Sequence, residues 1–213
     1  MGYREDPRDG EVKRRLHAGI EVMYYQHRCV YEPAEDTYLM ADALIELSRS
    51  YNARRILEIG YGSGYLTFLS RKLWESSSIV ATDVNPYSMG VHGIFRNDPA
   101  ITISLCSLDM CIKNGELFDL AYSNPPYIPV EEGELSECDG FLEKSWSCTG
   151  SCITDFCRAL CERGRVALLL VSTALDTSRV FGCMRHRGCS VEIVKREKLF
   201  FEELFVLKGV HKV

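Results

Sequence analysis

Two kinds of apolar pattern alternate along the chain, helical spacing in some segments and short unbroken runs in others. Leu39, Ala43 and Leu47 recur at helical spacing within residues 36–48, which predicts a helix that buries one face. Short apolar runs, such as the one over 166–171, predict strands that are buried on both sides. The same patterns predict further helices over 66–74, 86–96, 153–162 and 177–187, and strands over 55–59, 78–82, 101–105, 118–122, 190–194 and 203–207.

Strands and helices alternate, which is the arrangement of a parallel sheet with helices on both faces. The last two predicted strands have no room for a helix between them, so we expect them to pair antiparallel. We therefore predict an α/β fold with a mostly parallel sheet and a C-terminal antiparallel hairpin. The length suits a single domain over residues 1–213, in which residues 1–27 form a charged, weakly patterned extension of unassigned structure.

The composition narrows the class of protein. Lys and Arg number 25 and Asp and Glu 30, so the net charge is -5 and the bulk attraction for phosphate backbones is missing. No apolar run approaches the ~20 residues that a membrane-spanning helix needs. The N-terminus lacks the apolar core of a secretion signal. We expect a cytoplasmic protein, with a nuclear location left open, and neither a membrane nor a nucleic acid as direct partner.

Ten cysteines are a high number for such a chain. Without an export signal we expect no disulfides. The C-x-x-C spacing of zinc knuckles is missing. Cys148, Cys152, Cys157 and Cys161 could line one side of a helix and hold a metal, but thiols acting as small core residues explain them more simply. We predict no metal site.

A glycine-rich loop follows the strand predicted at 55–59 and precedes a helix. Gly60, Gly62 and Gly64 permit a tight turn and let a ligand approach backbone N–H groups. A dinucleotide fingerprint needs a glycine or alanine where Tyr65 stands, and the Gly-Lys-Ser/Thr of a P-loop is missing. The loop therefore predicts another kind of ligand site, and a plain strand–helix turn is the alternative.

Acidic residues stand at three successive strand ends, namely Glu58, Asp83 and Asp109. Asp83 can accept hydrogen bonds from both hydroxyls of a ribose, and Asp109 could reach an adenine amino group. Carboxylates suit an uncharged diol and a cationic ligand, whereas they repel a pyrophosphate. Each one alone could be a solvated loop charge or a helix cap. Together they indicate S-adenosylmethionine rather than a dinucleotide.

The segment Asn124-Pro125-Pro126-Tyr127 follows the strand predicted at 118–122. Its two prolines stiffen the loop and remove two backbone donors. The Asn124 side-chain oxygen and the Pro125 carbonyl can therefore accept both hydrogen bonds of one planar NH2 group, with Tyr127 flat against it. Such a nitrogen is a poor nucleophile, so aligning it with the methyl group supplies much of the catalysis, up to about 7–11 kcal/mol in model systems. An ordinary rigid turn is the alternative.

Together with residues 30–37, Val-Tyr-Glu-Pro-Ala-Glu-Asp-Thr, these motifs resemble the HemK-type protein glutamine methyltransferases, in particular their short eukaryotic and archaeal branch. The resemblance covers about residues 28–209. It implies a seven-stranded class I (Rossmann-like) S-adenosylmethionine-dependent methyltransferase fold. It also implies methyl transfer to the glutamine amide of the Gly-Gly-Gln motif in a class 1 translation termination factor.

The resemblance further implies the roles of single residues, by match to the family motifs. The cofactor would be held by Thr37, Glu58, Gly60, Gly62, Asp83, Asp109, the Met110 backbone and Asn124. The glutamine would be held by Asn124, Pro125, Pro126 and Tyr127, of which Asn124, Pro125 and Tyr127 act in catalysis.

The family also implies a partner, a small zinc-binding activator subunit that completes a heterodimer. The sequence adds a reason of its own, because the strand at 101–105 lies at a sheet edge in this fold. It presents Ile101, Ile103 and Leu105 beside uncovered backbone groups, and a partner strand could add there. An edge covered by the chain's own N-terminus is the alternative.

Two rival functions remain. The Asn-Pro-Pro-Tyr geometry also suits an adenine amino group, which a nucleic-acid enzyme would have to flip out of its stack. The resemblance also leaves a protein lysine or a small molecule open as the methyl acceptor. The net charge and the lack of room for a target-recognition domain argue against a nucleic acid. The second rival is a scaffold that binds the cofactor, or nothing, without catalysis, and Asn124→Ala would leave the function of such a scaffold intact.

Overall fold

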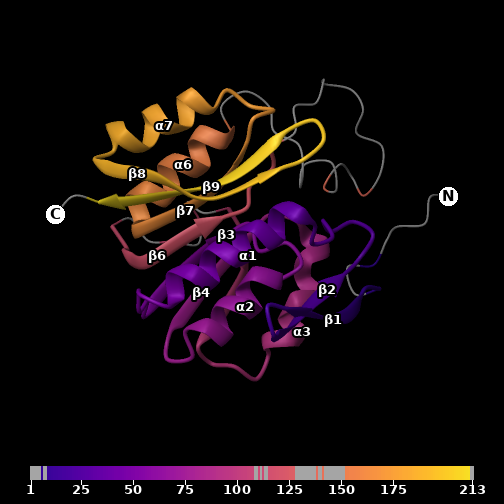
Figure 1. Cartoon of the computed structure of the whole chain (residues 1–213). Helices are drawn as coiled ribbons and strands as arrows, with labels where there is room; N and C mark the ends of the chain where they lie inside the picture. Colours follow the sequence, from indigo (N-terminus) through magenta and orange to yellow (C-terminus); the bar gives the residue numbers. More distant parts are fainter. Residues whose placement is uncertain are drawn as a thin grey trace.

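A seven-stranded sheet with helices on both faces forms the centre of the computed structural model (Figure 1). The structure describes residues 6, 9–107, 110, 112, 115–127, 138, 141 and 152–211, and for residue 152 the backbone only. The strand order across the sheet is β5-β4-β3-β6-β7-β9-β8. The strands are β3 (Arg55–Ile59), β4 (Ser78–Asp83), β5 (Ile101–Leu105), β6 (Phe118–Ser123), β7 (Gly164–Ser172), β8 (Cys189–Lys198) and β9 (Glu203–His211).

Strands β5, β4, β3, β6 and β7 run parallel, whereas β9 is antiparallel to both β7 and β8. The predicted α/β class and its antiparallel C-terminal hairpin are therefore confirmed. In the registers, Ile59 lies opposite Thr82 and Glu58 opposite Tyr122, so β3, β4 and β6 end at the same edge of the sheet. Ligands bind at this edge in open α/β sheets.

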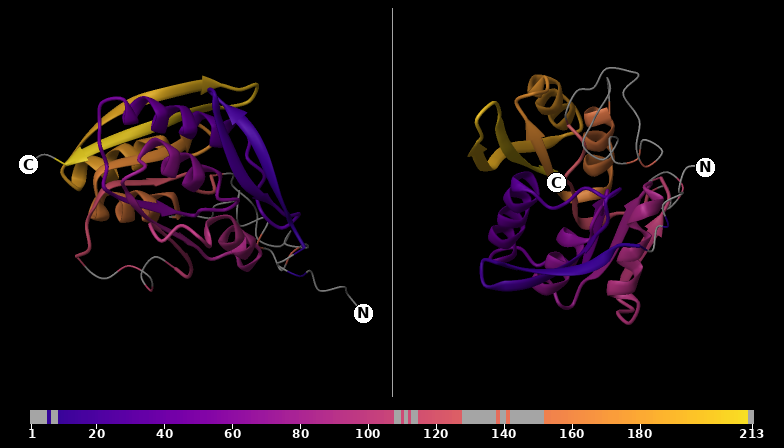
Figure 2. Two further views of the ribbon diagram at one scale, coloured as in Figure 1. Left: turned by 90° about the horizontal axis from the view of Figure 1, so that it is seen from below. Right: turned by 90° about the vertical axis from the view of Figure 1, so that its right-hand side faces the viewer.

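Helices α1 (Glu35–Ser48) and α2 (Tyr65–Leu73) cover one face of the sheet, and α6 (Cys152–Arg163) and α7 (Thr177–His186) cover the other (Figure 2). Neighbouring residues of a strand enter different cores: Ile56 packs in the α1–α2 core and Leu57 in the α6–α7 core. Because both faces of the strands are covered, their sequences read as unbroken apolar runs.

The helix predicted at 86–96 is divided in the structure. A 3₁₀ turn, η1 (Pro86–Gly90), leads into the short helix α3 (Val91–Phe95). Gly90, at the junction, lies so close to the ring of Tyr25 that a Cβ would come within 2.2 Å of it. Strands β8 and β9 run further than predicted, because their pairing continues through polar residues that face away from the core.

The N-terminal segment, for which no structure was assigned, forms a hairpin of β1 (Glu11–His17) and β2 (Ile20–Gln26). Ala18 and Gly19 have φ of 47° and 84°, as a two-residue turn with both central residues left-handed requires. The hairpin packs on α2 and α3 and forms a sheet of its own instead of covering β5. The alternative of a sheet edge covered by this N-terminal segment is thus not what the described residues show.

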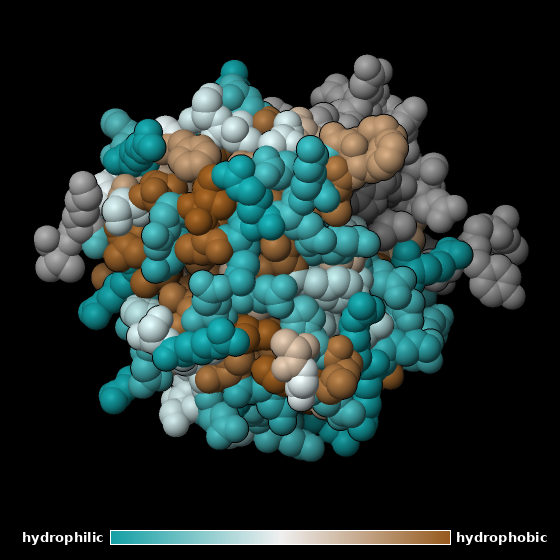
Figure 3. All heavy atoms as spheres, viewed as in Figure 1, coloured by the Kyte–Doolittle hydropathy of each residue, from teal (hydrophilic) through white to brown (hydrophobic). Residues whose placement is uncertain are grey.

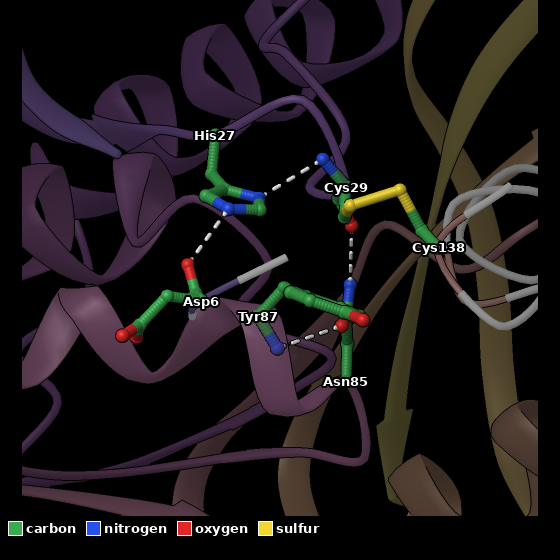
Figure 4. The surroundings of a disulfide bond; sticks show 6 residues. All are labelled: Asp6, His27, Cys29, Asn85, Tyr87 and Cys138. Atoms are coloured by element: carbon green, nitrogen blue, oxygen red, sulfur yellow. Dashed lines mark hydrogen bonds between the residues drawn. A yellow bond between two sulfur atoms is a disulfide. The ribbon is translucent and has the colours of Figure 1, made fainter. Parts of the chain in front are cut away.

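The expectation of no disulfides is wrong for Cys29, which is bonded to Cys138 (Figure 4). The two residues are 109 positions apart, so only the fold shows that they meet. Cys29 is fully buried, its N–H donates to Nδ1 of His27 (3.0 Å), and its carbonyl accepts from Nδ2 of Asn85 (2.8 Å). Cys106 is disulfide-bonded as well.

Other cysteines behave as the sequence indicated. Cys157, Cys161 and Cys189 are free, buried thiols that belong to the α6–α7 core. Within the part of the chain that the structure describes, no group of residues could hold a metal ion, and no helix is long and apolar enough to cross a bilayer.

Candidate active site

A cavity of about 490 Å³ opens where β3, β4 and β6 end. Its wall combines the loops after these strands with the segment before α1 and one side of α6. The predicted site residues on this wall are Thr37, Glu58, Gly60, Gly62, Asp83, Asn124, Pro125 and Pro126. The fold thus brings together most of the residues that the sequence analysis selected from three separate motifs.

The glycine loop leaves room where a ligand could lie. Gly60 and Gly62 have φ of 79° and 50°, and a Cβ added at either would meet no atom of the described chain within 4 Å. The N–H of Gly60 donates to the carbonyl of Thr82 at 2.7 Å, which ties the loop to the tip of β4. Gly64 differs, because a Cβ there would come within 2.7 Å of Val91 on α3. Two glycines therefore face open space and the third permits close packing.

The carboxylate of Asp83 holds the glycine loop and the next turn together. One oxygen accepts from the N–H of Gly62 at 2.7 Å and the other from the N–H of Asn85 at 2.8 Å. A carboxylate offers about four acceptor positions, so capacity remains for a ligand. Burial raises the pKa of Asp83, against the effect of the backbone N–H groups of Asn85, Gly62 and Val84. Its neighbour Val84 lies on the cavity wall with 61% of its surface exposed, and the sequence analysis did not predict this residue as part of the site.

Glu58 is buried at the back of the cavity. It accepts hydrogen bonds from the hydroxyls of Thr67 and, at 3.1 Å, Tyr122, and Ser70 in turn lies 2.8 Å from the Tyr122 oxygen. Burial raises the pKa of Glu58 to about 8, so its carboxyl group is largely neutral at pH 7 without a bound cation. The sequence analysis treated Glu58 as a carboxylate, and its burial instead favours the neutral form.

The side-chain amide of Asn124 has a fixed orientation. Its Nδ2 donates to Asp36 Oδ2 at 3.1 Å and to Thr37 Oγ1 at 3.3 Å. The opposite orientation would place the amide oxygen against the Asp36 carboxylate, which electrostatic repulsion forbids. Oδ1 is left buried and without a hydrogen-bond partner in the described chain. An unsatisfied buried acceptor costs about 1–3 kcal/mol, so its presence points to a donor supplied by a ligand.

Asp36 was quoted in the sequence motif but not predicted as a site residue. It is 3% exposed, and its second oxygen accepts from the Thr37 N–H at 2.6 Å and from the Tyr31 hydroxyl at 3.1 Å. Burial raises its pKa, while the hydrogen bond from Asn124 has the largest opposite effect. Besides that motif, the sequence signal was its place in the first turn of α1, where an acidic residue is also expected as a helix-stabilising charge.

The remaining predicted residues lie elsewhere. Tyr127 is 8% exposed, packs in the α1–α2 core and is not on the cavity wall, so the predicted stacking against the acceptor is not seen. Burial and the nearby Asp36 raise the pKa of Tyr127. The Met110 N–H donates at 3.0 Å to the carbonyl of Ser107, which is on the cavity wall, whereas Met110 itself is 83% exposed and is not on that wall. Asp109 is outside the described residues, and so is the long acidic loop expected over 128–147, apart from residues 138 and 141.

Known proteins resemble the chain in sequence, although no family model matches it. A chain of Methanocaldococcus jannaschii named as a protein N5-glutamine methyltransferase is 30% identical over 189 residues, 86% of this chain and 92% of that one. Methyltransferase HEMK2 of Mus musculus is 36% identical over 56% of this chain and 58% of its own length. The eRF1 methyltransferase catalytic subunit mtq2 of Schizosaccharomyces pombe is 28% identical over 55% of this chain and 59% of its own.

Solved structures share the fold. A structure of the E. cuniculi Mtq2–Trm112 complex, responsible for methylation of the eRF1 translation termination factor, matches with a TM-score of 0.64 and 24% identity over 86% of this chain and 99% of that one. The T. thermophilus 16S rRNA methyltransferase RsmC, solved with AdoMet and guanosine, matches with a TM-score of 0.67 and 16% identity over 95% of this chain and 51% of that one. These structures confirm the class I methyltransferase fold. The identity to the archaeal relative over most of both chains goes further, and shows that the chain belongs to the family of the protein N5-glutamine methyltransferases.

Proposed function

We propose that the chain transfers a methyl group from S-adenosylmethionine to the glutamine side-chain amide of the Gly-Gly-Gln motif in a class 1 translation termination factor. In this proposal residues 1–213 act as a single cytoplasmic methyltransferase domain and as the catalytic subunit of a heterodimer. Family membership and the names of the relatives support the reaction and the substrate. The observation that carries the proposal is the buried, unpartnered oxygen of Asn124 beside the glycine loop.

The residues around the glycine loop fit the cofactor. Gly60 and Gly62 offer open space against the backbone, Asp83 has acceptor capacity for ribose hydroxyls, and Val84 offers apolar surface to a flat ring. When bound, S-adenosylmethionine supplies a methyl group carried on a positively charged sulfur. We assign Glu58, which lies on the same wall and keeps a titratable carboxyl group, to the cofactor as well.

The Asn124 loop fits an amide NH2 group. Asn124 Oδ1 and the Pro125 carbonyl are the two acceptors, and neither Pro125 nor Pro126 has an N–H that would compete for them. Accepting from both N–H groups of the glutamine aligns its nitrogen and stabilises the positive charge that builds on it during transfer. The proton becomes acidic once the nitrogen carries the methyl group, so no strong base is needed. The hydrogen bonds to Asp36 and Thr37 fix the NH2 of Asn124, so that its oxygen is turned to the glutamine that accepts the methyl group.

The activator subunit is proposed to add a strand at β5. In the described sheet β5 is an edge strand that pairs with β4 alone. Ile101 and Ile103 are half-buried and Leu105 is 38% exposed, so the edge combines unpaired backbone groups with apolar side chains. Ile103→Pro removes one N–H from this edge and is expected to abolish co-purification of the activator.

Mass spectrometry of the Gly-Gly-Gln peptide tests the function. The chain, its activator, the termination factor and methyl-labelled cofactor are incubated together, and the peptide is expected to gain one methyl group on the glutamine side chain. A factor with Gly-Gly-Asn in place of the motif is the matched control. Label on lysine, or on adenine in added nucleic acid at a comparable rate, would contradict the proposal.

A further inference from the structure

Two adjacent aromatic side chains stand almost fully in solvent at the turn between β8 and β9. Phe200 and Phe201 are 93% and 94% exposed, and their ring centroids are 4.8 Å apart at an interplanar angle of 72°. In Figure 3 a tan, apolar projection stands at the upper right, at the end of the β8–β9 hairpin. Single exposed apolar residues are ordinary, but two neighbouring rings on a protruding turn mark an interaction surface.

The turn that presents these rings is held by hydrogen bonds on both sides. The N–H of Leu199 donates to the Glu202 carbonyl at 2.8 Å, which closes the turn. The N–H of Glu203 donates to the Thr173 hydroxyl at 2.8 Å, and the Thr173 N–H donates to the Glu203 carbonyl at 3.0 Å. The turn is therefore already ordered in the fold, and its backbone loses little conformational entropy when a partner covers it.

The same turn lies at the side of the sheet that carries the candidate site. Leu204 pairs with Ser172 at the end of β7, so the turn projects past the edge of the sheet where the cavity opens. The side chain of Glu202, in the same turn, receives a hydrogen bond from the Ser172 hydroxyl at the end of β7. The two phenylalanines are thus anchored at the edge of the sheet where the cavity opens.

We propose that Phe200 and Phe201 dock the protein substrate, by inserting into an apolar depression on the folded domain that presents the glutamine. This inference rests on the proposed function and adds where its substrate binds. One glutamine side chain offers the cavity few contacts, so a protein acceptor needs binding energy from outside it. The proposed activator edge, β5, is at the opposite end of the sheet from β8, which leaves the turn free for the substrate in the heterodimer.

The double variant Phe200→Ser/Phe201→Ser, prepared with the activator, tests this docking. With the whole termination factor we expect the KM to rise at least tenfold and the kcat to stay within twofold. With a short Gly-Gly-Gln peptide, which lacks the folded domain, we expect both constants to stay within twofold, as should the cofactor Kd. Val12→Ser/Leu16→Ser, which removes two other exposed apolar side chains from β1, is the matched control and should change none of these values.

A direct binding measurement separates failure of the docking from failure of the reaction. The immobilised factor should bind the heterodimer, saturated with the demethylated cofactor, at least tenfold more tightly than it binds the double variant, whether or not methyl transfer occurs. Equal binding by both proteins, no binding by either, or equal losses on factor and peptide would overturn the proposal. Loss of binding to neutral phosphatidylcholine vesicles, with factor binding intact, would overturn it in favour of a membrane contact.

Discussion

The glycine loop and the Asn124 loop face the same cavity but are built in opposite ways. The glycine loop is a backbone surface, in which Gly60 and Gly62 take left-handed conformations and leave the space above them open. The Asn124 loop works through a side chain, whose NH2 is satisfied by Asp36 and Thr37 while its oxygen is kept free. A backbone surface suits affinity for a large ligand, and a single oriented oxygen suits alignment of one small group.

This difference predicts that binding and turnover can be separated by mutation. The largest effect is expected for Asn124→Ala, which removes the unpartnered acceptor and leaves the glycine loop unchanged. Turnover should fall by about a thousandfold or more, as when an enzyme loses a central transition-state contact. The cofactor Kd should change by only a few fold. Single-turnover transfer of labelled methyl groups, combined with calorimetry of cofactor binding, measures both quantities.

The variant Asn124→Asp controls for size. It keeps the shape of the side chain but brings a second carboxylate to Asp36, so it should be as inactive as Asn124→Ala. Loss of cofactor binding together with turnover in Asn124→Ala would show that the two loops are not separable.

Asp83→Ala is expected to act on the other loop. The variant removes acceptors for the N–H groups of Gly62 and Asn85 as well as those proposed for the ribose. Charged hydrogen bonds of this kind are worth about 1.5–3 kcal/mol, which corresponds to a cofactor Kd raised about 10- to 150-fold. The kcat at saturating cofactor should fall less than threefold. Asp42→Ala, which removes an exposed carboxylate on α1, is the control for titration calorimetry.

Asp36→Asn sharpens the comparison, because it changes the support of Asn124 and not Asn124 itself. The amide oxygen of the new residue can keep the bonds to Thr37 and Tyr31, so its NH2 would face the NH2 of Asn124. Asn124 would then turn its oxygen toward the new NH2 and away from the substrate glutamine. We expect the kcat to fall about 10- to 50-fold with an unchanged cofactor Kd.

The neighbouring Glu35→Gln, on an exposed side chain of the same helix turn, should keep full activity and serves as its control. A kcat for Asp36→Asn equal to that of the unaltered chain would mean that Asn124 is oriented without Asp36.

The two loops also differ in what the sequence could reveal. The glycine spacing and the Asn-Pro-Pro-Tyr run are local patterns, and Gly60, Gly62, Asn124, Pro125 and Pro126 lie on the cavity wall, whereas Gly64 and Tyr127 do not. The Tyr127 side chain is buried beside Asp36, where it packs in the α1–α2 core and does not face the cavity. The supporting role of Asp36 could not be predicted, since it depends on a contact between residues 88 positions apart.

The fold shows the same division between local and distant causes. The central strands could be predicted because burial on both faces leaves a continuous apolar run, as in β7. The hairpin β1–β2 was missed because one side of it faces solvent, and Lys13, Arg14 and Arg15 interrupt the alternation. The Cys29–Cys138 disulfide depends on the folded chain, and arguments from the cellular compartment cannot locate it.

The smallest expected effect concerns Glu58, the buried carboxyl group behind the glycine loop. Its pKa rises from 4.5 to about 8 on folding, so between these values the folded state binds more protons than the unfolded state, and stability falls as pH rises. Glu58→Gln keeps an acceptor for Thr67 and Tyr122 and removes the titration. The free energy of unfolding of Glu58→Gln minus that of the unaltered chain should therefore increase by about 1.4 kcal/mol from pH 6 to pH 7. Urea unfolding at both pH values measures it, and a difference that does not change with pH would mean that Glu58 is already ionised in the folded chain.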